Sequence, residues 1–385
     1  MKVVHLCLGA FYIDHYSYQE NMLPKFHKEL GYAVEVIAST QSFDEEGKPC
    51  YLQSTGTYQN EYDIKVTRLP YKNRSKTWKK LKRYIGTYNA LENAAPDILF
   101  IHNCQFLDID QIVRYLQQHP SVTVYVDNHA DFSNSATNLL SKNILHKVIW
   151  RSCAHQIEPY TKKFYGVLPA RVDFLTDVYG LPKEKCELLV MGADDELVEK
   201  AKNSGARERI RERYGIADND FLVVTGGKIN QYRPETLHLM EAVTTINREN
   251  IKLLVFGVVS KNLKDDFNRL CEDRHIAYAG WLQTAETYDC FAAADLVVFP
   301  GLHSVMWEQA VAQGKVCIFR DIEGFHHVDI GGNAEFVRNG SVDGLKKILL
   351  EIIDDPSKYQ RMKSIAEDKG MAAFSYKEIA KRSIL

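Results

Sequence analysis

The sequence predicts an α/β protein in which parallel sheets are covered by helices. Short apolar runs alternate with amphipathic stretches along the 385-residue chain, a pattern typical of strand–helix units around a parallel sheet. The pattern stops in the charge-rich residues 192–220 and then begins again, which predicts two units of similar architecture joined by that segment. The length also favours two or three domains, at roughly 150 residues each.

In the first half, the apolar runs predict strands, and one amphipathic stretch predicts a helix that ends at Gly31. The expected strands are Val3–Leu8, Ala33–Ala38, Ile98–His102, Val122–Val126 and Glu187–Met191, and the expected helix is Gln19–Leu30. Two of the strands run into polar residues, His102-Asn103-Cys104 and Asp127-Asn128-His129. Ligands of open parallel sheets bind at the carboxyl ends of strands, so these are candidate site positions.

The second half repeats the alternation of strands and helices. Strands are expected at Phe221–Thr225, Ile251–Phe256, Ile276–Ala279, Leu296–Phe299 and Val316–Phe319. Helices are expected near Pro234–Asn247, Ala285–Ala293, Val305–Gln313 and Val342–Asp354. The two halves are alike in architecture only, because no sequence repeat of 20 to 50 residues is present.

The composition argues against several classes of protein. With 48 basic and 50 acidic residues, the chain has no overall charge that would favour nucleic acid. No apolar run approaches the roughly 18 residues needed to cross a bilayer. The eight cysteines are scattered and no export signal precedes them, which favours reduced thiols in a cytoplasmic protein. The motifs of dinucleotide-binding, P-loop, esterase and zinc-protease sites are also missing from the sequence.

A glycine-rich turn with two cations follows the first strand of the second half. Gly226 and Gly227 let the backbone approach a ligand closely, and a helix is expected to begin at Pro234. Lys228 and Arg233 would neutralise a diphosphate held there. The alternative is a solvated loop with incidental charges.

The segment from Pro300 to Ala310 is a second candidate site. Gly301 and Ser304 precede a helix whose N-terminus would expose N–H groups to an anion. Glu308, about one turn into that helix, could accept hydrogen bonds from two ribose hydroxyls. A carboxylate in a first turn could instead serve only to stabilise the helix dipole.

Histidines raise two further questions. His129 is crowded by Asp127, Asn128 and Asp131, a polar set that suits the vicinal hydroxyls of a sugar, although a structural histidine is the alternative. His326-His327-Val328-Asp329 fits no standard metal site, so we expect no metal.

Residues 64–91 contain nine Lys or Arg and no Asp or Glu. Within this segment, apolar residues recur at helical spacing, which predicts a basic amphipathic helix. Those residues are Trp78, Leu81, Ile85 and Tyr88, and the cations on other faces are Lys76, Lys79, Lys80, Lys82 and Arg83. The segment could contact an anionic membrane or capture a phosphorylated acceptor, and the alternative is a solvated face of a packed helix.

At these residues, the chain resembles a glycosyltransferase of the GT-B fold, and in particular glycosyltransferase family 4 (group 1). The basic pair Lys228 and Arg233 is similar to the Arg/Lys pair of that family. Further similar segments are Ser17-Tyr18-Gln19-Glu20-Asn21, Leu30–Ala38, Tyr278-Ala279-Gly280-Trp281-Leu282, Glu308-Gln309-Ala310 with Gly314, and Phe374-Ser375-Tyr376.

The resemblance implies two Rossmann-like domains that face each other across a cleft. These would be an acceptor domain at 1–195 and a nucleotide-sugar donor domain at 196–369, with a helix at about 370–385 that packs back on the first domain. It also implies a retaining, metal-independent hexosyltransferase. That enzyme would need no cofactor and would take a UDP- or GDP-linked sugar as donor and a glycan or lipid-linked acceptor, as in bacterial surface polysaccharide synthesis. Such an enzyme would be cytoplasmic or peripheral at the inner face of the membrane.

The resemblance also assigns roles to residues. His129, Lys228 and Arg233 would be catalytic. Donor binding would involve Gly9, Gly226, Gly227, Lys228, Arg233, Gly280, Trp281, Leu282, Gly301, His303, Ser304 and Glu308. Acceptor binding would involve Asp14, His15, Tyr18, Asn128 and Asp131.

The chain departs from the family pattern in two places. The first Glu of the family's Glu-x7-Glu motif is replaced, since the position eight residues before Glu308 is Pro300. The first loop has Gly9 where many members have several glycines. Two alternatives therefore stay open: a nucleotide-sugar-binding protein without transferase activity, and a nucleotide-sugar epimerase on the same fold.

Overall fold

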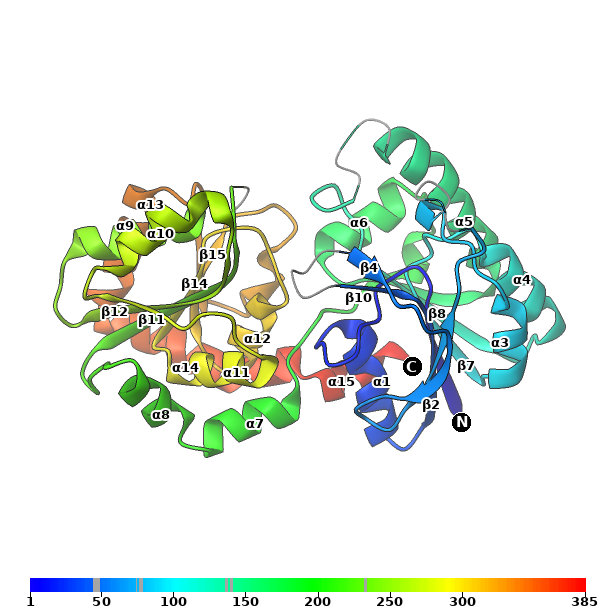
Figure 1. Cartoon of the computed structure of the whole chain (residues 1–385), viewed down its shortest axis with the longest axis horizontal. Helices are drawn as coiled ribbons and strands as arrows, with labels where there is room; N and C mark the ends of the chain where they lie inside the picture. Colours follow the sequence, from blue (N-terminus) through cyan, green and yellow to red (C-terminus); the bar gives the residue numbers. More distant parts are fainter. Residues whose placement is uncertain (44–48, 74, 76–78, 136–137, 139–140, 232–233) are drawn as a thin grey trace. The chain divides into compact units, whose positions relative to one another are not determined.

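The computed structural model describes residues 1–43, 49–73, 75, 79–135, 138, 141–231 and 234–385, which form two compact units (Figure 1). Unit 1 contains Met1–Met191 and Tyr376–Leu385, and unit 2 contains Gly192–Ser375. Each unit is built on its own parallel or mainly parallel sheet, so the prediction of two α/β units is confirmed. The chain leaves unit 1 after Met191, four residues before the expected boundary, and returns to it at Tyr376.

Unit 1 has an eight-stranded sheet in the order β10-β9-β8-β7-β1-β2-β6-β5. Its neighbouring strands are parallel, except for the antiparallel pair β5 and β6. The strands are β1 (Lys2–Cys7), β2 (Ala33–Ser39), β5 (Gly56–Gln59), β6 (Lys65–Leu69), β7 (Ile98–His102), β8 (Thr123–Asn128), β9 (Thr161–Gly166) and β10 (Cys186–Leu188). A separate hairpin pairs β3 (Gln41–Phe43) with β4 (Pro49–Tyr51).

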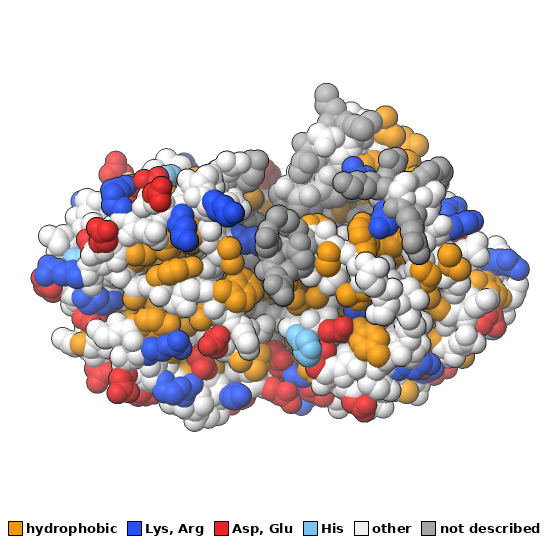
Figure 2. Space-filling model, viewed as in Figure 1, with side chains coloured by type: hydrophobic (Ala, Val, Ile, Leu, Met, Phe, Trp, Pro, Cys, Tyr) orange, Lys and Arg blue, Asp and Glu red, His pale blue; other side chains and the backbone are white. Residues whose placement is uncertain are grey.

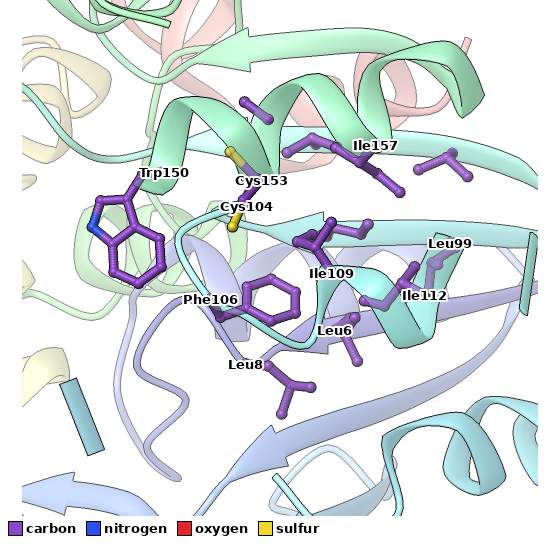
Figure 3. Packing of buried hydrophobic residues seen from close by; sticks show 14 of the residues in the cluster. Leu6, Leu8, Leu99, Cys104, Phe106, Ile109, Ile112, Trp150, Cys153 and Ile157 are labelled. Carbon is purple, nitrogen blue, oxygen red and sulfur yellow. The ribbon is translucent and has the colours of Figure 1, made fainter. Parts of the chain in front are cut away.

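Helices cover both faces of this sheet. They are α1 (Gln19–Glu29), α3 (Thr87–Ala94), α4 (Ile109–Gln118), α5 (Arg151–Ile157), α6 (Pro169–Asp177) and α15 (Tyr376–Ser383), with a π-helix at Ser141–Trp150. Side chains of β1 alternate between the faces. Leu6 points into the cluster that contains Ile109 of α4 and Ile157 of α5 (Figure 3), whereas Val3 packs with residues of α1 and α15. Burial on both faces explains the continuous apolar runs of the sequence.

Unit 2 has a six-stranded, fully parallel sheet in the order β13-β12-β11-β14-β15-β16. The strands are β11 (Phe221–Ile229), β12 (Ile251–Val259), β13 (Ile276–Tyr278), β14 (Leu296–Phe299), β15 (Val316–Arg320) and β16 (Ala334–Val337). The helices are α7 (Asp195–Asn203), α8 (Ala206–Arg213), α9 (Glu235–Ile246), α10 (Lys264–Cys271), α11 (Thr284–Ala293), α12 (Met306–Ala312), α13 (Val342–Ile353) and α14 (Pro356–Phe374).

The interpretation of residues 192–220 as a connection between domains is wrong. This segment forms α7 and α8, which pack against α11 within unit 2. Arg211 of α8 is buried, and its guanidinium lies 2.6 Å from the carboxylate of Asp295. The charge density that resembled a linker therefore includes a buried ion pair, which a single sequence cannot distinguish from solvated charges.

The expected amphipathic helix within residues 64–91 is not continuous in the residues that the structure describes. Residues 65–69 form strand β6, Lys79 and Lys80 are helical, an antiparallel bridge joins Tyr71 to Tyr84, and α3 begins only at Thr87. Trp78 and Lys76 lie outside the described residues. Backbone hydrogen bonds from Lys72 to Arg83 and from Ile85 to Pro70 pair the two sides of the segment, and this pairing overrides the local helical spacing.

Several cations of this segment are bound inside unit 1. Arg68 is buried and donates hydrogen bonds to the carbonyl oxygens of Tyr12 and Ser39. Arg83 pairs with Asp110. On the face drawn in Figure 2, Lys and Arg side chains are interspersed with Asp and Glu. None of the described helices has the length and apolar character needed to span a bilayer.

Gly370 allows α14 to cross close to α12. A Cβ atom at this position would lie 2.0 Å from the carbonyl oxygen of Val311. We expect Gly370→Ala to lower the free energy of unfolding by about 1–3 kcal/mol, because the backbone of α12 has to move. Ser364→Ala, on the exposed side of the same helix, should change it by less than about 0.5 kcal/mol. Urea unfolding of both variants would measure this, and equal effects would contradict the close approach.

Candidate functional site

The glycine-rich turn of unit 2 belongs to the sheet rather than to a loop. β11 continues through Gly226, Gly227 and Lys228 and pairs with β12, where Gly227 lies opposite Gly257. A Cβ on Gly226 would lie 2.3 Å from the ring of Phe256. One on Gly257, which has a φ of +121°, would lie 1.9 Å from the carbonyl oxygen of Gly227. The glycines are thus required for strand packing, a reason that the sequence reasoning did not consider.

A small pocket opens beside the carboxyl end of β11. Its walls come from β11, the first turn of α9 and the segment 299–306. The candidate residues Gly226, Lys228, Gly301 and Ser304 line it, and Lys228 is exposed. Arg233 lies outside the described residues. The structure therefore brings four of the expected donor-binding residues together within one unit.

Two polar atoms at this pocket lack a hydrogen-bond partner among the described residues. They are the buried hydroxyl of Thr225 and Oε2 of Glu235, and both residues line the pocket. Oε1 of Glu235 lies 3.9 Å from the guanidinium of Arg320. Leaving buried polar atoms unpaired is costly, so a polar ligand or water would satisfy them. Neither residue was assigned a role from the sequence, although both flank the glycine-rich segment that contains Lys228 and Arg233.

Glu308 is held by two histidines. Its carboxylate is fully buried, and it accepts hydrogen bonds from Nε2 of His303 at 2.9 Å and of His327 at 2.8 Å. Burial alone would raise the pKa of Glu308, but the two histidines outweigh it and lower the pKa to about 2. Glu308 and His303 are not among the residues that line the pocket. Their expected contact with the donor stays a prediction.

Three of the expected donor-binding residues, Gly280, Trp281 and Leu282, follow β13. Trp281 is 67% exposed, whereas Leu282 is buried. The carbonyl oxygen of Gly280 accepts a hydrogen bond from the Gly257 N–H at 2.7 Å. This bond ties the segment to β12, but none of its three residues lines the pocket.

In unit 1, His129 lies after β8 with its side chain 20% exposed. Its Nε2 atom is 3.3 Å from Oδ2 of Asp127 and 3.9 Å from Oε1 of Glu20. Burial alone would lower the pKa of His129, but the carboxylates of Asp127 and Glu20 raise it above its usual value. In the sequence, Glu20 stood only in a segment that resembles the family, so its position beside His129 was not expected.

The expected acceptor residues beside His129 serve the loop itself. Asn128 is fully buried and donates to the carbonyl oxygens of Ala130 and Arg171. Asp131 pairs with Arg171 at 2.8 Å and accepts hydrogen bonds from the backbone of Ser133 and Asn134. Both side chains therefore stabilise the conformation of the loop, and their contact with an acceptor stays a prediction.

The loop after β1 holds the other expected residues. Asp14 pairs with Tyr58 and Arg68, His15 is 81% exposed with a φ of +66°, and Tyr18 precedes α1 with an exposed fraction of 36%. A Cβ on Gly9 would lie 2.4 Å from the carbonyl oxygen of Asn103, so this glycine lets two site loops approach each other.

Lys82 is a partly buried cation that was expected on a helix face. Its ammonium group donates to the carbonyl oxygen of Gly9 at 2.5 Å. Burial lowers the pKa of Lys82 to about 8. A cation therefore lies against the first loop of unit 1, which no motif indicated.

Among the described residues, two side-chain sets have atoms close enough to hold a metal ion, within 4.8 Å of one another. One contains Glu20, His102 and His129, and the other His303, Glu308 and His327. In the second set, the Glu308 carboxylate accepts hydrogen bonds from both histidines. In the first set, His102 is hydrogen-bonded to Asp127, and Glu20 lies 3.9 Å from His129. His326 pairs instead with Asp321. That no metal is required stays a prediction.

The buried charge of Glu308 should affect the stability of the protein. A carboxylate with a lowered pKa stabilises the fold above its unfolded pKa of about 4.5, and this contribution is lost as the pH falls toward 2. We expect Glu308→Gln to lower the free energy of unfolding at pH 7 by about 3 kcal/mol and to flatten its fall between pH 4.5 and 2. The control is Glu323→Gln at an exposed position. Parallel pH profiles of the wild type and Glu308→Gln would contradict the arrangement.

Comparisons with known proteins agree with this architecture. Residues 206–369 match the family model of glycosyl transferases group 1. No curated protein sequence matches the chain.

Solved structures match the chain along its whole length. HepE from Anabaena in complex with UDP and glucose is 15% identical, with a TM-score of 0.66 over 99% of this chain and 98% of that one. WaaG, a glycosyltransferase involved in lipopolysaccharide biosynthesis, is 15% identical, with a TM-score of 0.68 over 99% of each chain. UDP-GlcNAc 2-epimerase from Neisseria meningitidis bound to UDP-GlcNAc is 12% identical, with a TM-score of 0.63 over 100% of this chain and 99% of that one.

These likenesses establish that the chain has the fold of the solved GT-B glycosyltransferases. Within it, residues 206–369, most of unit 2, match the glycosyl transferases group 1 family.

Proposed function

We propose that this protein transfers a hexose with retention of configuration from a UDP- or GDP-linked donor to a glycan or lipid-linked acceptor, in bacterial surface polysaccharide synthesis. No cofactor is required. The observation that carries the proposal is the polar pocket of unit 2 at the end of β11. It combines the Lys228 cation with unpaired oxygen atoms of Thr225 and Glu235, within the segment that matches the family model.

The two proposed ends of the donor differ in chemistry. The diphosphate takes the Lys228 ammonium group and the cation of Arg233, which balance the charge that develops as the nucleotide leaves. UDP is the favoured nucleotide, because the solved HepE complexes contain UDP and UDP-glucose. WaaG, the relative from lipopolysaccharide biosynthesis, supports a surface-glycan acceptor.

At the sugar end of the donor we place Glu235. Gly301 lies beside this carboxylate, since a Cβ on Gly301 would be 3.4 Å from its Oε2 atom. Pro300, the residue that occupies the position of the missing family Glu, precedes Gly301 in the chain. A carboxylate from the first turn of α9 therefore lies beside Gly301, next to the position where the first Glu of the family motif is missing. We propose that the Glu235 carboxylate binds the donor sugar, because its oxygen atoms can accept hydrogen bonds from the sugar hydroxyls.

Retention follows from a front-face substitution. In this mechanism the departing diphosphate accepts the proton of the acceptor hydroxyl, while the C–O bond to the diphosphate breaks and the bond to the acceptor forms on the same face. Lys228 and Arg233 stabilise the charge on the leaving oxygen. His129 contacts the donor sugar or its surroundings.

An epimerase is the second candidate, because a UDP-GlcNAc 2-epimerase shares the fold. Product analysis separates the candidates. A transferase converts the donor to free nucleoside diphosphate and a glycosylated acceptor, whereas an epimerase returns an isomeric nucleotide sugar. A protein that only binds nucleotide sugars gives thermal stabilisation without turnover on any acceptor offered.

Contact of residues 64–91 with an anionic membrane stays a prediction. Fewer cations are left for this contact than the sequence indicated, because Arg68 and Lys82 donate hydrogen bonds inside unit 1 and are not available to lipid. Vesicle sedimentation with Lys79→Ala, Lys80→Ala would test the cations that remain.

Removal of the Lys228 charge should abolish most of the transfer. We expect Lys228→Ala to lower kcat about a hundredfold to a thousandfold, and Lys228→Arg to retain most of it, because the charge and not the ammonium shape is needed. Lys347→Ala, on the exposed side of α13, is the control. Initial rates of nucleotide release measure the effect, and wild-type turnover of Lys228→Ala would exclude the role.

Glu235 should act on the sugar and not on the nucleotide. We expect Glu235→Gln to weaken binding of the intact nucleotide sugar about tenfold while the Kd for the free nucleoside diphosphate changes by less than about twofold. Isothermal titration with both ligands measures this difference. An equal loss for the two ligands would mean that Glu235 shapes the pocket and does not recognise the sugar.

A further inference from the structure

Three buried histidines form a hydrogen-bonded chain through unit 1. Nε2 of His5 on β1 lies 2.9 Å from Nδ1 of His27 on α1, and Nδ1 of His5 lies 3.0 Å from Nε2 of His102 on β7. The three side chains have an exposed fraction of 0%. Each neighbouring pair of rings is stacked, with centroids 5.1 and 5.3 Å apart. A neutral imidazole has one donor and one acceptor nitrogen, so linked neutral rings must all donate in the same direction along the histidine chain.

At each end of the chain of three histidines lies a group that accepts hydrogen bonds. At one end, Nε2 of His27 lies 3.0 Å from the carbonyl oxygen of Ala380 and 3.0 Å from the hydroxyl of Ser383, both on α15. At the other end, Nδ1 of His102 lies 2.7 Å from Oδ2 of Asp127, beside His129. A carbonyl oxygen and a carboxylate both accept hydrogen bonds.

The carbonyl of Ala380 sets the direction. It can only accept, so Nε2 of His27 carries the proton. Burial lowers the pKa of His27 to about 4 and holds the pKa of His5 well below its usual value, so both rings are neutral and have one N–H each. Nδ1 of His27 therefore accepts from Nε2 of His5, and Nδ1 of His5 accepts from Nε2 of His102. This order leaves Nδ1 of His102 facing Asp127.

A neutral His102 would direct a lone pair at the carboxylate of Asp127 across 2.7 Å. One extra proton must therefore lie between them. Burial on its own would raise the pKa of Asp127, but His102 and His129 outweigh it and hold the pKa below its usual range. The carboxylate also accepts the backbone N–H of Asn103 at 3.1 Å. The proton thus belongs to His102.

The opposite direction is less favourable. It would need the Ser383 hydroxyl to donate to Nε2 of His27, and a ring lone pair would then face the carbonyl of Ala380 at 3.0 Å. It would also break the 2.9 Å hydrogen bond from Ser383 to that carbonyl. Only the first direction satisfies every group of the chain.

We propose that His102 is a buried imidazolium, kept protonated by the chain that ends on the Ala380 carbonyl, and that its charge offsets Asp127 and so limits how readily His129 takes up a proton. His5, His27 and His102 are positioning residues, since none of them is placed at the substrate. The charge assignment is independent of the proposed function, and only its effect on catalysis rests on the role of His129.

Other charged and titratable groups face the Asp127 and His129 pair, and they limit what a variant can change. These are Glu20 on α1, Arg171 on α6, Cys7 on β1 and Cys104 after β7. The variants below leave all of them in place.

The first test needs no variant. In histidine-labelled protein at pH 7, the ¹⁵N shifts distinguish imidazolium from the two neutral tautomers. We expect His102 to be doubly protonated and His5 and His27 to carry the proton on Nε2. A neutral His102 with its proton on Nδ1 would overturn the proposal.

The second test breaks the direction of the chain. In His27→Phe, His5 is free to turn its N–H toward His102, which then loses its extra proton. His102 and His129 have ring nitrogens within 4.8 Å, so we expect the titration midpoint of His129 to rise by about one pH unit or more. His27→Gln keeps a donor for Ala380 and an acceptor for His5, and its midpoint should stay at the wild-type value.

Failure of the charge assignment can be distinguished from failure of the proposed function. A midpoint of His129 that is the same in His27→Phe and His27→Gln would overturn the proposal. If the midpoint rises but the pH profile of kcat/KM does not move, the charge assignment stands and the catalytic role of His129 fails. If His27→Phe does not fold, the tautomers of the wild-type protein decide the question alone.

Discussion

The packing of α15 against the sheet of unit 1 is the interaction on which the candidate residues of that unit depend. A mainly parallel sheet of this kind is covered on both faces, and α15 covers part of one face after a stretch of 184 residues that belongs to unit 2. Tyr376 stacks on Phe26 of α1 with ring centroids 6.3 Å apart, and Ile379 joins the same cluster. The carbonyl of Ala380 then provides the acceptor on which the buried histidines end. The last ten residues therefore complete the electrostatics around His129 as well as the core.

The two units use the same device to hold a carboxylate inside the protein. Asp127 lies against His102 and His129, and Glu308 lies against His303 and His327. An isolated buried carboxylate would be strongly destabilising, so imidazole partners are needed to keep it charged. In both cases one histidine of the pair is itself a candidate site residue, His129 in unit 1 and His303 in unit 2. The charge state of each unit's site thus depends on contacts that lie beneath its surface.

Much of the fold could be predicted from apolar periodicity. Ten predicted strands correspond to strands of the two sheets, because buried parallel strands such as β1 and β14 are short apolar runs of the expected length. β6 and α8 could not be predicted, since each holds cations, at Arg68 and Arg211, whose partners are distant in the sequence. Local patterning cannot reveal a charge that is neutralised by a carbonyl or carboxylate on another element.

The sequence by itself determined the α/β class, the two sheets and the resemblance to group 1 glycosyltransferases, and it pointed to the segments around Lys228 and Pro300 that line the pocket of unit 2. These depend on local residue patterns, which survive in the sequence whatever the packing. Only the tertiary structure decided which polar residues face a pocket and which are internal. Glu308 is internal and Glu235 is at the pocket because of how α12 and α9 pack on the sheet. The histidine chain joins residues 5, 27, 102 and 380, and hydrogen bonds between such distant positions exist only after the chain has folded.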